Sequence, residues 1–376
     1  MKKVTPLLVF GTRPEAIKMA PVVSECARRD DVVQAVLCVT GQHREMLEQV
    51  MGYFEIKADV DLAVMSAGQN LSELTARCLI GLHAVIEQCQ PDCVVAQGDT
   101  TTVMAASLAA FYQRVPFIHV EAGLRTGNLQ APWPEEFNRR VASLTAALHC
   151  APTERGAQAL ISEGIPQSRV HITGNTVIDA LAWTVERERR NSKTWRAKYA
   201  ALSEKPLVLI TGHRRENFGI GLANLCQALS LLAAHFPEVE FIYPVHLNPQ
   251  VQEPVRAALS GRENIHLVPP APYPEFVWLM DRSTLILTDS GGVQEEAPSL
   301  GKPVLVMRDS TERPEALESG AVELIGTNTS VIVERVTLLL ESPQERERRR
   351  VAVNPFGDGR AAERIVELIA SRAWIA

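Results

Sequence analysis

The sequence predicts an α/β protein built from two doubly wound parallel sheets. Short runs of apolar and β-branched residues alternate with longer helical patterns along the chain. These short runs are continuously apolar, which is typical of strands that a parallel sheet buries on both faces. The alternation occurs about six times, is interrupted by a charged stretch, and then occurs about six times again. A chain of 376 residues is also long for a single domain.

The expected strands form two series. The first series lies at 7–10, 35–41, 93–99, 117–123, 148–153 and 170–175. The charged stretch 185–205 then predicts a solvated helix and a connection between domains. The second series lies at 207–213, 240–246, 265–270, 285–290, 303–308 and 321–326. We therefore expect Rossmann-like domains at 1–175 and 176–359, with a final helix at 360–376 that could pack on either of them.

Composition and charge exclude several classes of function. The net charge of -6 gives no general attraction to nucleic acid or to an anionic membrane. Seven scattered cysteines, an odd number without a C-x-x-C pair, predict reduced thiols and neither disulfides nor a zinc site. No apolar run approaches the roughly 18 residues of a membrane span, and the N-terminal run is too short for a signal peptide. We expect a cytoplasmic protein without a bound metal.

Unusual polar residues lie at or just after the carboxyl ends of the expected strands. In open parallel sheets, ligands bind outside these ends. Two such edges facing one another would form a cleft that these side chains line. The alternative is that the strands simply lead into polar surface loops. The residues are Arg13, Gln42, His43, Arg44, Asp99, Glu121, Asn175, His213, Arg214, Arg215, His246, Asp289 and Ser290.

The stretch DSGGVQEE at 289–296 predicts a phosphate site. Ser290, Gly291 and Gly292 place unobstructed backbone N–H groups at a helix start, which suits a diphosphate. Glu296, one turn further, has the position to accept both hydroxyls of a ribose. The structural alternative is a glycine-containing helix cap with glutamates that match the helix dipole.

Two turns share the sequence Arg-Pro-Glu, at 13–15 and 313–315. Proline at the first helical position and glutamate near the positive helix end are explained by helix initiation alone. An arginine at this place opposes the helix dipole unless an anion binds there. Arg13 and Arg313 are therefore candidate phosphate ligands.

Four further residues are candidates for the chemistry. Asp99 ends a buried strand, although an aspartate before an alanine-rich helix is also an ordinary cap. Glu121 follows a strand with no helix to cap, which favours function, whereas Glu135 could simply belong to a first helical turn. His213 lies beside two arginines, as in an anion site.

Two kinds of pattern are interpreted as structural. Asp59-Val60-Asp61 imitates the D-x-D of metal-dependent sugar transferases, but paired carboxylates are common in polar segments. The runs RERR at 187–190 and RERRR at 346–350 are expected to be solvated helix faces.

The order of the motifs resembles that of the non-hydrolysing UDP-N-acetylglucosamine 2-epimerases. The resemblance implies a GT-B-like fold, in which two Rossmann-like domains face one another across a cleft and the C-terminal helix packs back on the first domain. It runs through almost the whole chain in order. The matching stretches are FGTRPEAIKMAP, TGQHREML, QGDTTT, HVEAGLRT, PWPEE, ITGNTVIDAL, TGHRREN, YPVHLNP, FVWLM, LTDSGGVQEEAPSLGKPVLVMRDSTERPEA and NPFGDG.

The chemistry of that family agrees with these residues. No carbonyl acidifies the hydrogen at C2 of the sugar, and the chain has no dinucleotide fingerprint for a nicotinamide. Departure of UDP from C1 acidifies C2 instead and gives 2-acetamidoglucal. Re-addition of UDP with protonation on the opposite face gives UDP-N-acetylmannosamine, which feeds cell-surface polysaccharide synthesis. The route requires cations at the diphosphate, carboxylates near C2 and no cofactor.

The resemblance also implies roles for individual residues and a homodimer. The acid–base residues are Asp99, Glu121 and Glu135, with His213 near the diphosphate. The nucleotide contacts are Arg13, Lys18, Phe276, Ser290, Gly291, Gly292, Glu296 and Arg313, and Phe276 is near the uracil. A second molecule of UDP-N-acetylglucosamine, acting as an activator, contacts Gln42, His43, Arg214 and His246.

Two positions depart from the family pattern, and three rival functions stay open. Gln97 stands where relatives often have histidine, and Ala271 stands where some carry glutamine near the uracil. The rivals are a hydrolysing epimerase, a GT-B glycosyltransferase and a nucleotide-sugar sensor without turnover. The carboxylates argue against the sensor, because binding of UDP requires none of them.

Overall fold

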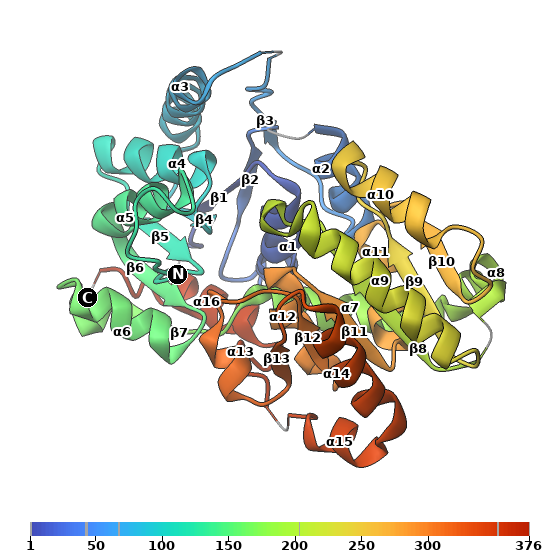
Figure 1. The fold of residues 1–376 in the computed structure, drawn as a ribbon. Helices are drawn as coiled ribbons and strands as arrows, with labels where there is room; N and C mark the ends of the chain where they lie inside the picture. The colour runs from blue at the N-terminus through green and yellow to red at the C-terminus, as the bar shows by residue number, and fades with distance from the viewer. Residues whose placement is uncertain (1, 42–43, 67, 203, 352, 376) are drawn as a thin grey trace. The chain divides into compact units, whose positions relative to one another are not determined.

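The computed structural model describes residues 2–41, 44–66, 68–202, 204–351 and 353–375. The chain divides into two compact units. Unit 1 comprises Met1–Ala180 and Phe356–Ala376, and unit 2 comprises Leu181–Pro355. Each unit contains one parallel sheet with helices packed against it (Figure 1). The predicted class of two doubly wound α/β domains is confirmed.

Unit 1 has a seven-stranded sheet in the order β3-β2-β1-β4-β5-β6-β7. The strand order changes direction between β1 and β4, which creates a topological switch point outside their carboxyl ends. The strands are β1 (Pro6–Phe10), β2 (Val36–Val39), β3 (Val60–Asp61), β4 (Cys93–Gln97), β5 (Phe117–Val120), β6 (Ala146–Ala151) and β7 (Val170–Ile172). The helices are α1 (Arg13–Arg28), α2 (Arg44–Tyr53), α3 (Leu71–Cys89), α4 (Thr101–Tyr112), α5 (Glu135–Thr145), α6 (Glu154–Ser162) and α16 (Ala361–Ala370), and α7 (Thr176–Arg190) begins here and continues into unit 2.

Unit 2 has a six-stranded sheet in the order β10-β9-β8-β11-β12-β13, with its switch point between β8 and β11. The strands are β8 (Leu207–Thr211), β9 (Glu240–Pro244), β10 (Ile265–Val268), β11 (Leu285–Thr288), β12 (Val304–Val306) and β13 (Val322–Leu324). The helices are α8 (Ser192–Lys198), α9 (Ile220–His235), α10 (Pro249–Leu259), α11 (Tyr273–Arg282), α12 (Gly291–Glu296), α13 (Pro314–Glu318), α14 (Thr329–Glu341) and α15 (Pro343–Arg348).

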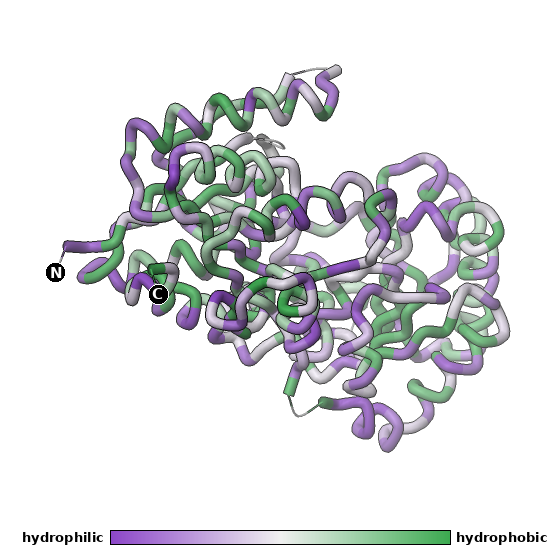
Figure 2. The backbone as a smooth tube through the Cα atoms, turned by 90° about the vertical axis from the view of Figure 1, so that its left-hand side faces the viewer, coloured by the Kyte–Doolittle hydropathy of each residue, from purple (hydrophilic) through white to green (hydrophobic). Residues whose placement is uncertain are grey.

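The central strands are buried along their length, as their apolar sequences predict. Every residue of β1 and of β4 is buried. The helices cover the sheets with one side, and Figure 2 shows hydrophobic and hydrophilic segments alternating along them, as in amphipathic helices. Several strands end two or three residues earlier than predicted. Gly41, Gly98 and Gly123 follow β2, β4 and β5 with φ values of 72°, 88° and 99°, so the chain leaves the sheet there.

The expected domain boundaries at 175 and 359 shift to 180 and 355. The reason is a set of contacts that ties the start of α7 to the last segment of the chain. The backbone N–H of Asn175 donates to the carbonyl of Phe356 at 2.7 Å. The Asp179 carboxylate accepts the N–H groups of Ala361 at 3.2 Å and Ala362 at 2.8 Å, so it caps α16.

Two local predictions need correction. Strand β3 was not predicted, because only Val60 and Asp61 pair with β2 and both belong to the polar D-x-D pattern. Asp59 accepts the N–H of Leu37 at 2.8 Å and Asp61 accepts that of Ala63 at 2.9 Å, so both carboxylates hold backbone. Arg349, in the run expected to be solvated, is only 7% exposed and forms an ion pair with Glu323 at 2.5 Å.

Strands β5 and β6 carry two buried histidines that lie opposite one another. His119 and His149 are register partners, and both side chains are fully buried. Neither ring nitrogen of His149 has a hydrogen-bond partner among the described residues. Burial lowers the pKa of His149 to about 3 and that of His119 to about 4.

We expect His149→Leu to make the free energy of unfolding less dependent on pH. The unfolded chain binds a proton on each histidine below about pH 6.5 and the folded chain does not. Stability is therefore present above that pH and is lost on acidification, by about 1.4 kcal/mol per pH unit and per histidine. Urea unfolding at several pH values between 4.5 and 6 measures the slope. An unchanged slope in the variant would contradict this account.

Candidate active site

The turn after β1 starts α1, as its sequence predicts, and it is also hydrogen-bonded to the turn after β4. Thr12 caps α1, and the Glu15 carboxylate accepts the backbone N–H of Thr12 at 2.7 Å and of Gly11 at 3.0 Å. The hydroxyl of Thr100 donates to the other Glu15 oxygen at 2.7 Å, which joins this turn to the one after β4. Burial raises the pKa of Glu15 against these hydrogen bonds. Glu15 is thus structural, while Arg13 is half-buried at the first position of α1.

Glu121 is held at the switch point of unit 1 by three donor side chains. Lys18 Nζ contacts both carboxylate oxygens, at 2.6 and 2.7 Å, and Asn175 Nδ2 donates at 3.3 Å. Gln97 Nε2 also donates to Oε2. The Glu121 side chain is only 10% exposed, and its backbone adopts a left-handed conformation with φ of 58°. A left-handed backbone and a carboxylate surrounded by donors make Glu121 a candidate for the chemistry. The pairing of Lys18 with Glu121 was not predicted.

Asp99 is part of a charge network whose other side chains come from α5. Arg139 is 6% exposed and forms an ion pair with the Asp99 carboxylate. The same guanidinium contacts Glu136, which is completely buried, at 3.2 Å. Asn138 Nδ2 donates to the backbone carbonyl of Asp99 at 2.9 Å. Burial favours the neutral form of Glu136, but the N–H of Thr126 and the neighbouring arginines lower its pKa overall.

Sequence reasoning missed Arg139, Asn138 and Glu136 in this network. One signal was available, because Glu136 precedes Arg139 by three residues and Arg140 by four, which places them on one helix face. Glu135 is half-buried at the first position of α5. No ion pair involves its carboxylate in the described part of the chain. This fits both a role in the chemistry and a simple place in the first helical turn.

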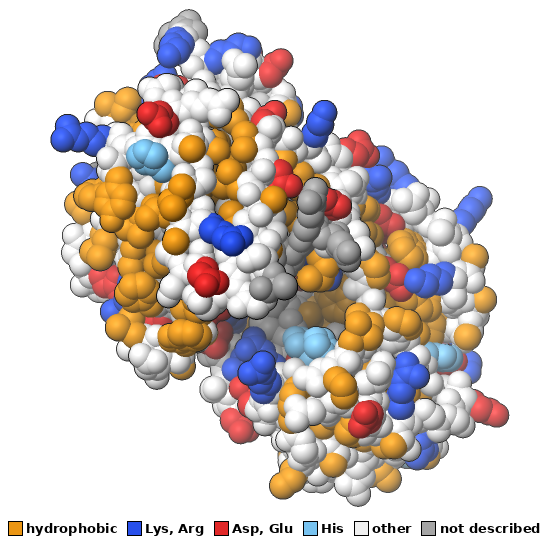
Figure 3. Space-filling model, turned by 90° about the horizontal axis from the view of Figure 1, so that it is seen from above, with side chains coloured by type: hydrophobic (Ala, Val, Ile, Leu, Met, Phe, Trp, Pro, Cys, Tyr) orange, Lys and Arg blue, Asp and Glu red, His pale blue; other side chains and the backbone are white. Residues whose placement is uncertain are grey.

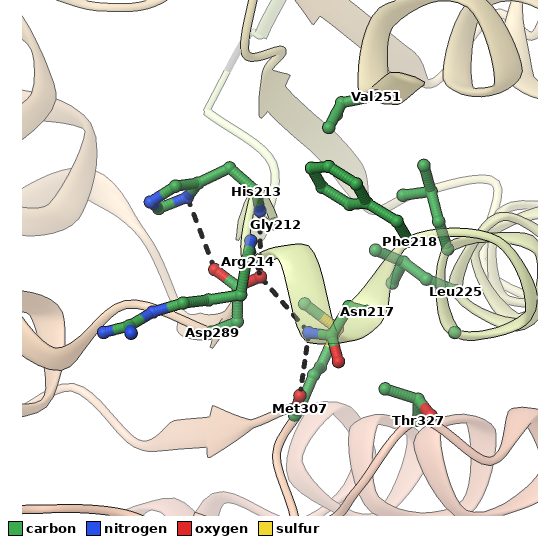
Figure 4. Close-up of a pocket in the computed structure, with 12 residues that line it drawn as sticks. Gly212, His213, Arg214, Asn217, Phe218, Leu225, Val251, Asp289, Met307 and Thr327 are labelled. Atoms are coloured by element: carbon green, nitrogen blue, oxygen red, sulfur yellow. Dashed lines mark hydrogen bonds and ion pairs between the residues drawn. The ribbon is translucent and has the colours of Figure 1, made fainter. Parts of the chain in front are cut away.

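In unit 2, Asp289 organises the switch point between β8 and β11. Its buried carboxylate accepts the backbone N–H of His213 and of Arg214, both at 2.8 Å, and the Asn217 side chain at 3.2 Å. Figure 4 shows Asp289 below His213, with Asn217 bridging to the carbonyl of Met307. Asp289 was noted only as a polar strand end, and its organising role was not predicted.

His213 has a defined orientation and favours the neutral form. Its Nδ1 lies 3.4 Å from Asp289 Oδ1, and its ring stacks on that of His246 with centroids 5.5 Å apart. Burial lowers the pKa of His213, and the Asp289 carboxylate opposes this shift only in part. The small cavity behind these residues has a volume of about 10 Å³, room for one water and not for a sugar.

The predicted phosphate site lies at the start of α12, close to two arginines. A Cβ added at Gly291 would stand 3.4 Å from Arg313 Cζ and 3.7 Å from Arg214 Nη2. Glycine therefore leaves the helix start open beneath two guanidinium groups. Gly292 is exposed, and a Cβ there would make only ordinary contacts, so packing does not explain it. Ser290 is the N-cap residue.

Arg313 has structural partners that the sequence did not reveal. Its Nε pairs with Glu295 at 2.8 Å and its Nη1 with Glu312 at 2.9 Å. The inference that an arginine beside a helix start lacks a structural reason is therefore wrong for Arg313. Glu296 is 7% exposed and accepts the hydroxyl of Tyr273 at 3.0 Å, which fixes its carboxylate near the same helix.

The remaining predicted residues are only partly located. Phe276 is half-buried on α11, and Ala271 lies half-buried just before that helix. Gln42 and His43 of the predicted activator site lie outside the described residues, whereas Arg214 and His246 are both at the carboxyl edge of the unit 2 sheet. No group of His, Cys, Asp and Glu side chains in the described ranges could hold a metal ion.

Comparison with known proteins identifies the family. The family model for UDP-N-acetylglucosamine 2-epimerase matches residues 25–370. The chain belongs to the UDP-N-acetylglucosamine 2-epimerase family. It is 54% identical to the UDP-N-acetylglucosamine 2-epimerase of Yersinia pestis, over 96% of this chain and 97% of that one. It is 52% identical to that of Escherichia coli K12, over 96% and 97%.

Solved structures of the family have the same fold over their whole length. The UDP-GlcNAc 2-epimerase from Neisseria meningitidis, bound to UDP-GlcNAc, superposes with a TM-score of 0.90 at 49% identity, covering 98% of this chain and 100% of that one. The Methanocaldococcus jannaschii enzyme in complex with UDP-GlcNAc and UDP gives 0.80 at 31% identity, with coverage of 98% and 100%. A glycosyltransferase from Rickettsia africae gives 0.63 at 12% identity over 99% of both chains, which shows a shared GT-B-like fold alone.

As a member of this family the chain is an isomerase. Among the described residues, no helix combines the length and the apolar composition that crossing a bilayer would require.

Proposed function

We propose that the protein interconverts UDP-N-acetylglucosamine and UDP-N-acetylmannosamine without hydrolysis. The observation that carries the proposal is the Glu121 carboxylate, which three donors hold at the switch point of unit 1. In unit 2, the open start of α12 beside Arg313 suits the diphosphate of a nucleotide sugar.

The reaction proceeds by elimination and re-addition. The bond between C1 and the diphosphate oxygen breaks, and UDP leaves with the electron pair. A carboxylate takes the proton from C2, and C1 and C2 become joined by the double bond of 2-acetamidoglucal. In the reverse sense a diphosphate oxygen bonds to C1, and C2 receives a proton on the opposite face. The product is the C2 epimer, and no atom is gained or lost.

Each group of side chains has a task in this scheme. Asp99, Glu121 and Glu135 exchange protons with the sugar, and Lys18 keeps a positive charge beside Glu121 while the leaving group departs. Arg13, Arg313 and the N–H groups of Ser290, Gly291 and Gly292 stabilise the departing diphosphate, with His213 beside it. Glu296 accepts the ribose hydroxyls, and Phe276 packs near the uracil.

The products of one incubation distinguish this function from its rivals. Purified protein is given UDP-N-acetylglucosamine without nicotinamide, and the nucleotides and free sugars are separated and quantified. The proposal expects UDP-N-acetylmannosamine at equilibrium with substrate. Free N-acetylmannosamine with UDP as the main product would indicate the hydrolysing reaction, and unchanged substrate would indicate transfer or sensing.

Two finer properties are part of the proposal. We propose that a second substrate molecule activates the enzyme at Arg214 and His246. The rate should then rise sigmoidally with substrate concentration, and the curve should become hyperbolic in His246→Ala.

We also propose a homodimer. Its support is the large hydrophobic side chains that unit 1 exposes, among them Ile80 at 71% and Leu144 at 82%. Figure 3 shows hydrophobic side chains gathered on one part of the surface. Light scattering should find a dimer that Leu144→Glu weakens, and a monomer in the unaltered protein would contradict it.

A further inference from the structure

Gln97 is the last residue of β4, beside the switch point of unit 1. Its backbone is the register partner of Val120, which directly precedes Glu121. The side chain is only 4% exposed, and its Nε2 donates to Glu121 Oε2. The amide orientation follows from chemistry, because the reverse orientation would place a carbonyl oxygen against a carboxylate oxygen.

The side-chain oxygen of Gln97 makes no hydrogen bond that would stabilise the described fold. Gln97 Oε1 is buried and has no hydrogen-bond partner among the described residues. A buried acceptor without a partner costs stability, so packing alone would favour an apolar side chain of the same length. The residue is therefore better explained by what its nitrogen does to Glu121 than by a contribution to folding.

The three donors to Glu121 hold it in different ways. Lys18 reaches both carboxylate oxygens, but it does so through a flexible chain that is 17% exposed. Asn175 donates at the longer distance of 3.3 Å. Gln97 donates to one oxygen from the end of a central, buried strand. Gln97 is therefore the donor best placed to fix the rotation of the Glu121 carboxylate plane.

We propose that Gln97 is a positioning residue for proton transfer by Glu121. Its amide selects one rotation of the carboxylate, and it does so without taking up or releasing a proton itself. This inference rests on the proposed epimerase function. A small rotation of a reacting group is enough to slow a reaction by one to two orders of magnitude.

Gln97→Met tests the proposal, because methionine keeps the length and lacks the donor. We expect kcat for epimerisation to fall about 10- to 100-fold while KM changes less than about twofold. The thermal unfolding temperature should stay the same or rise, because the unpaired acceptor is removed. A purely structural residue would give the opposite pattern, a lower unfolding temperature with kcat preserved. Gln113→Met is the matched control, since that side-chain amide donates to the His83 carbonyl at 2.6 Å, and the C-cap of α4 is made by the backbone N–H of Gln113, which the variant keeps.

Gln97→Glu provides an independent readout in the same fold. The side chain at this position contacts the carboxylate of Glu121, after β5, and that carboxylate forms an ion pair with Lys18, on α1. At pH 8 a second carboxylate would repel Glu121, whereas in acid its protonated form donates a hydrogen bond as the amide does. The ratio of variant to wild-type kcat should rise at least about tenfold between pH 8 and pH 5.5.

The outcomes separate this inference from the proposed function. Absence of epimerisation by the unaltered protein would remove the function itself. An active wild type together with Gln97→Met at wild-type kcat, or Gln97→Glu with a pH-independent ratio, would overturn only the role of Gln97. Reduced kcat with unchanged KM and stability, and recovery of Gln97→Glu in acid, would establish it.

Discussion

Glu121→Gln is expected to lower kcat for epimerisation about 10²- to 10⁴-fold, the range that a positioned general acid or base contributes. Glutamine has the size of glutamate and can still accept hydrogen bonds from Lys18 and Asn175, but it cannot take up the C2 proton. Steady-state turnover and calorimetric binding of UDP measure the two effects separately. UDP should bind with little change, because its proposed ligands at the start of α12 are untouched.

Glu25→Gln is the control for that experiment. Glu25 lies on α1, its side chain is 9% exposed, and it forms an ion pair with Arg28 at 2.5 Å, so it is a carboxylate as buried as that of Glu121 with one cationic partner. Turnover should be preserved in this variant. Asp99→Asn should behave like Glu121→Gln, since asparagine can accept from Arg139 but cannot transfer a proton. Turnover within tenfold of wild type in either test variant would exclude that residue from proton transfer.

Arg139→Met is expected to lower the free energy of unfolding by about 3–5 kcal/mol, the effect of removing one partner from a buried ion pair. The variant removes the cation that Asp99 and the fully buried Glu136 share. Epimerisation should also be lost, because Asp99 is no longer held. Urea unfolding and turnover measured on the same preparation give both values.

Arg140→Met is the matched control on the same helix. Arg140 contacts Glu136 at 3.1 Å, but its side chain is 40% exposed, and pairs of this kind contribute no more than about 1 kcal/mol. An equal loss of stability in both variants would mean that Arg139 acts through general packing of α5 and not through the Asp99 network.

The sequence predicted the strands and the edge of the sheet where the candidate residues lie, because both depend on local patterns. Continuous apolar runs identify buried parallel strands, and Asp99 and Glu121 were chosen as candidates from their places just after two of them. Strand β3 was missed, since two paired residues leave almost no pattern. The direction changes at β1/β4 and at β8/β11 explain why these particular strand ends carry the candidate residues.

Partners of the site residues could not be predicted, because strand order sets them and sequence distance does not. Lys18 meets Glu121 across 103 residues, and Asn175 meets it across 54. Arg313 was interpreted as an anion ligand alone because its partner Glu295 belongs to another element. The burial of single charged side chains could not be predicted either, because Arg349 lies in a charged run and is nevertheless buried.

The central claim is that the proton at C2 is removed and returned while UDP is detached from C1. Incubation with UDP-N-acetylglucosamine in deuterium oxide, followed by NMR, tests it most directly. We predict that UDP-N-acetylmannosamine forms with deuterium at C2 and without added nicotinamide. Epimerised product that retains the original hydrogen at C2 would contradict elimination and re-addition.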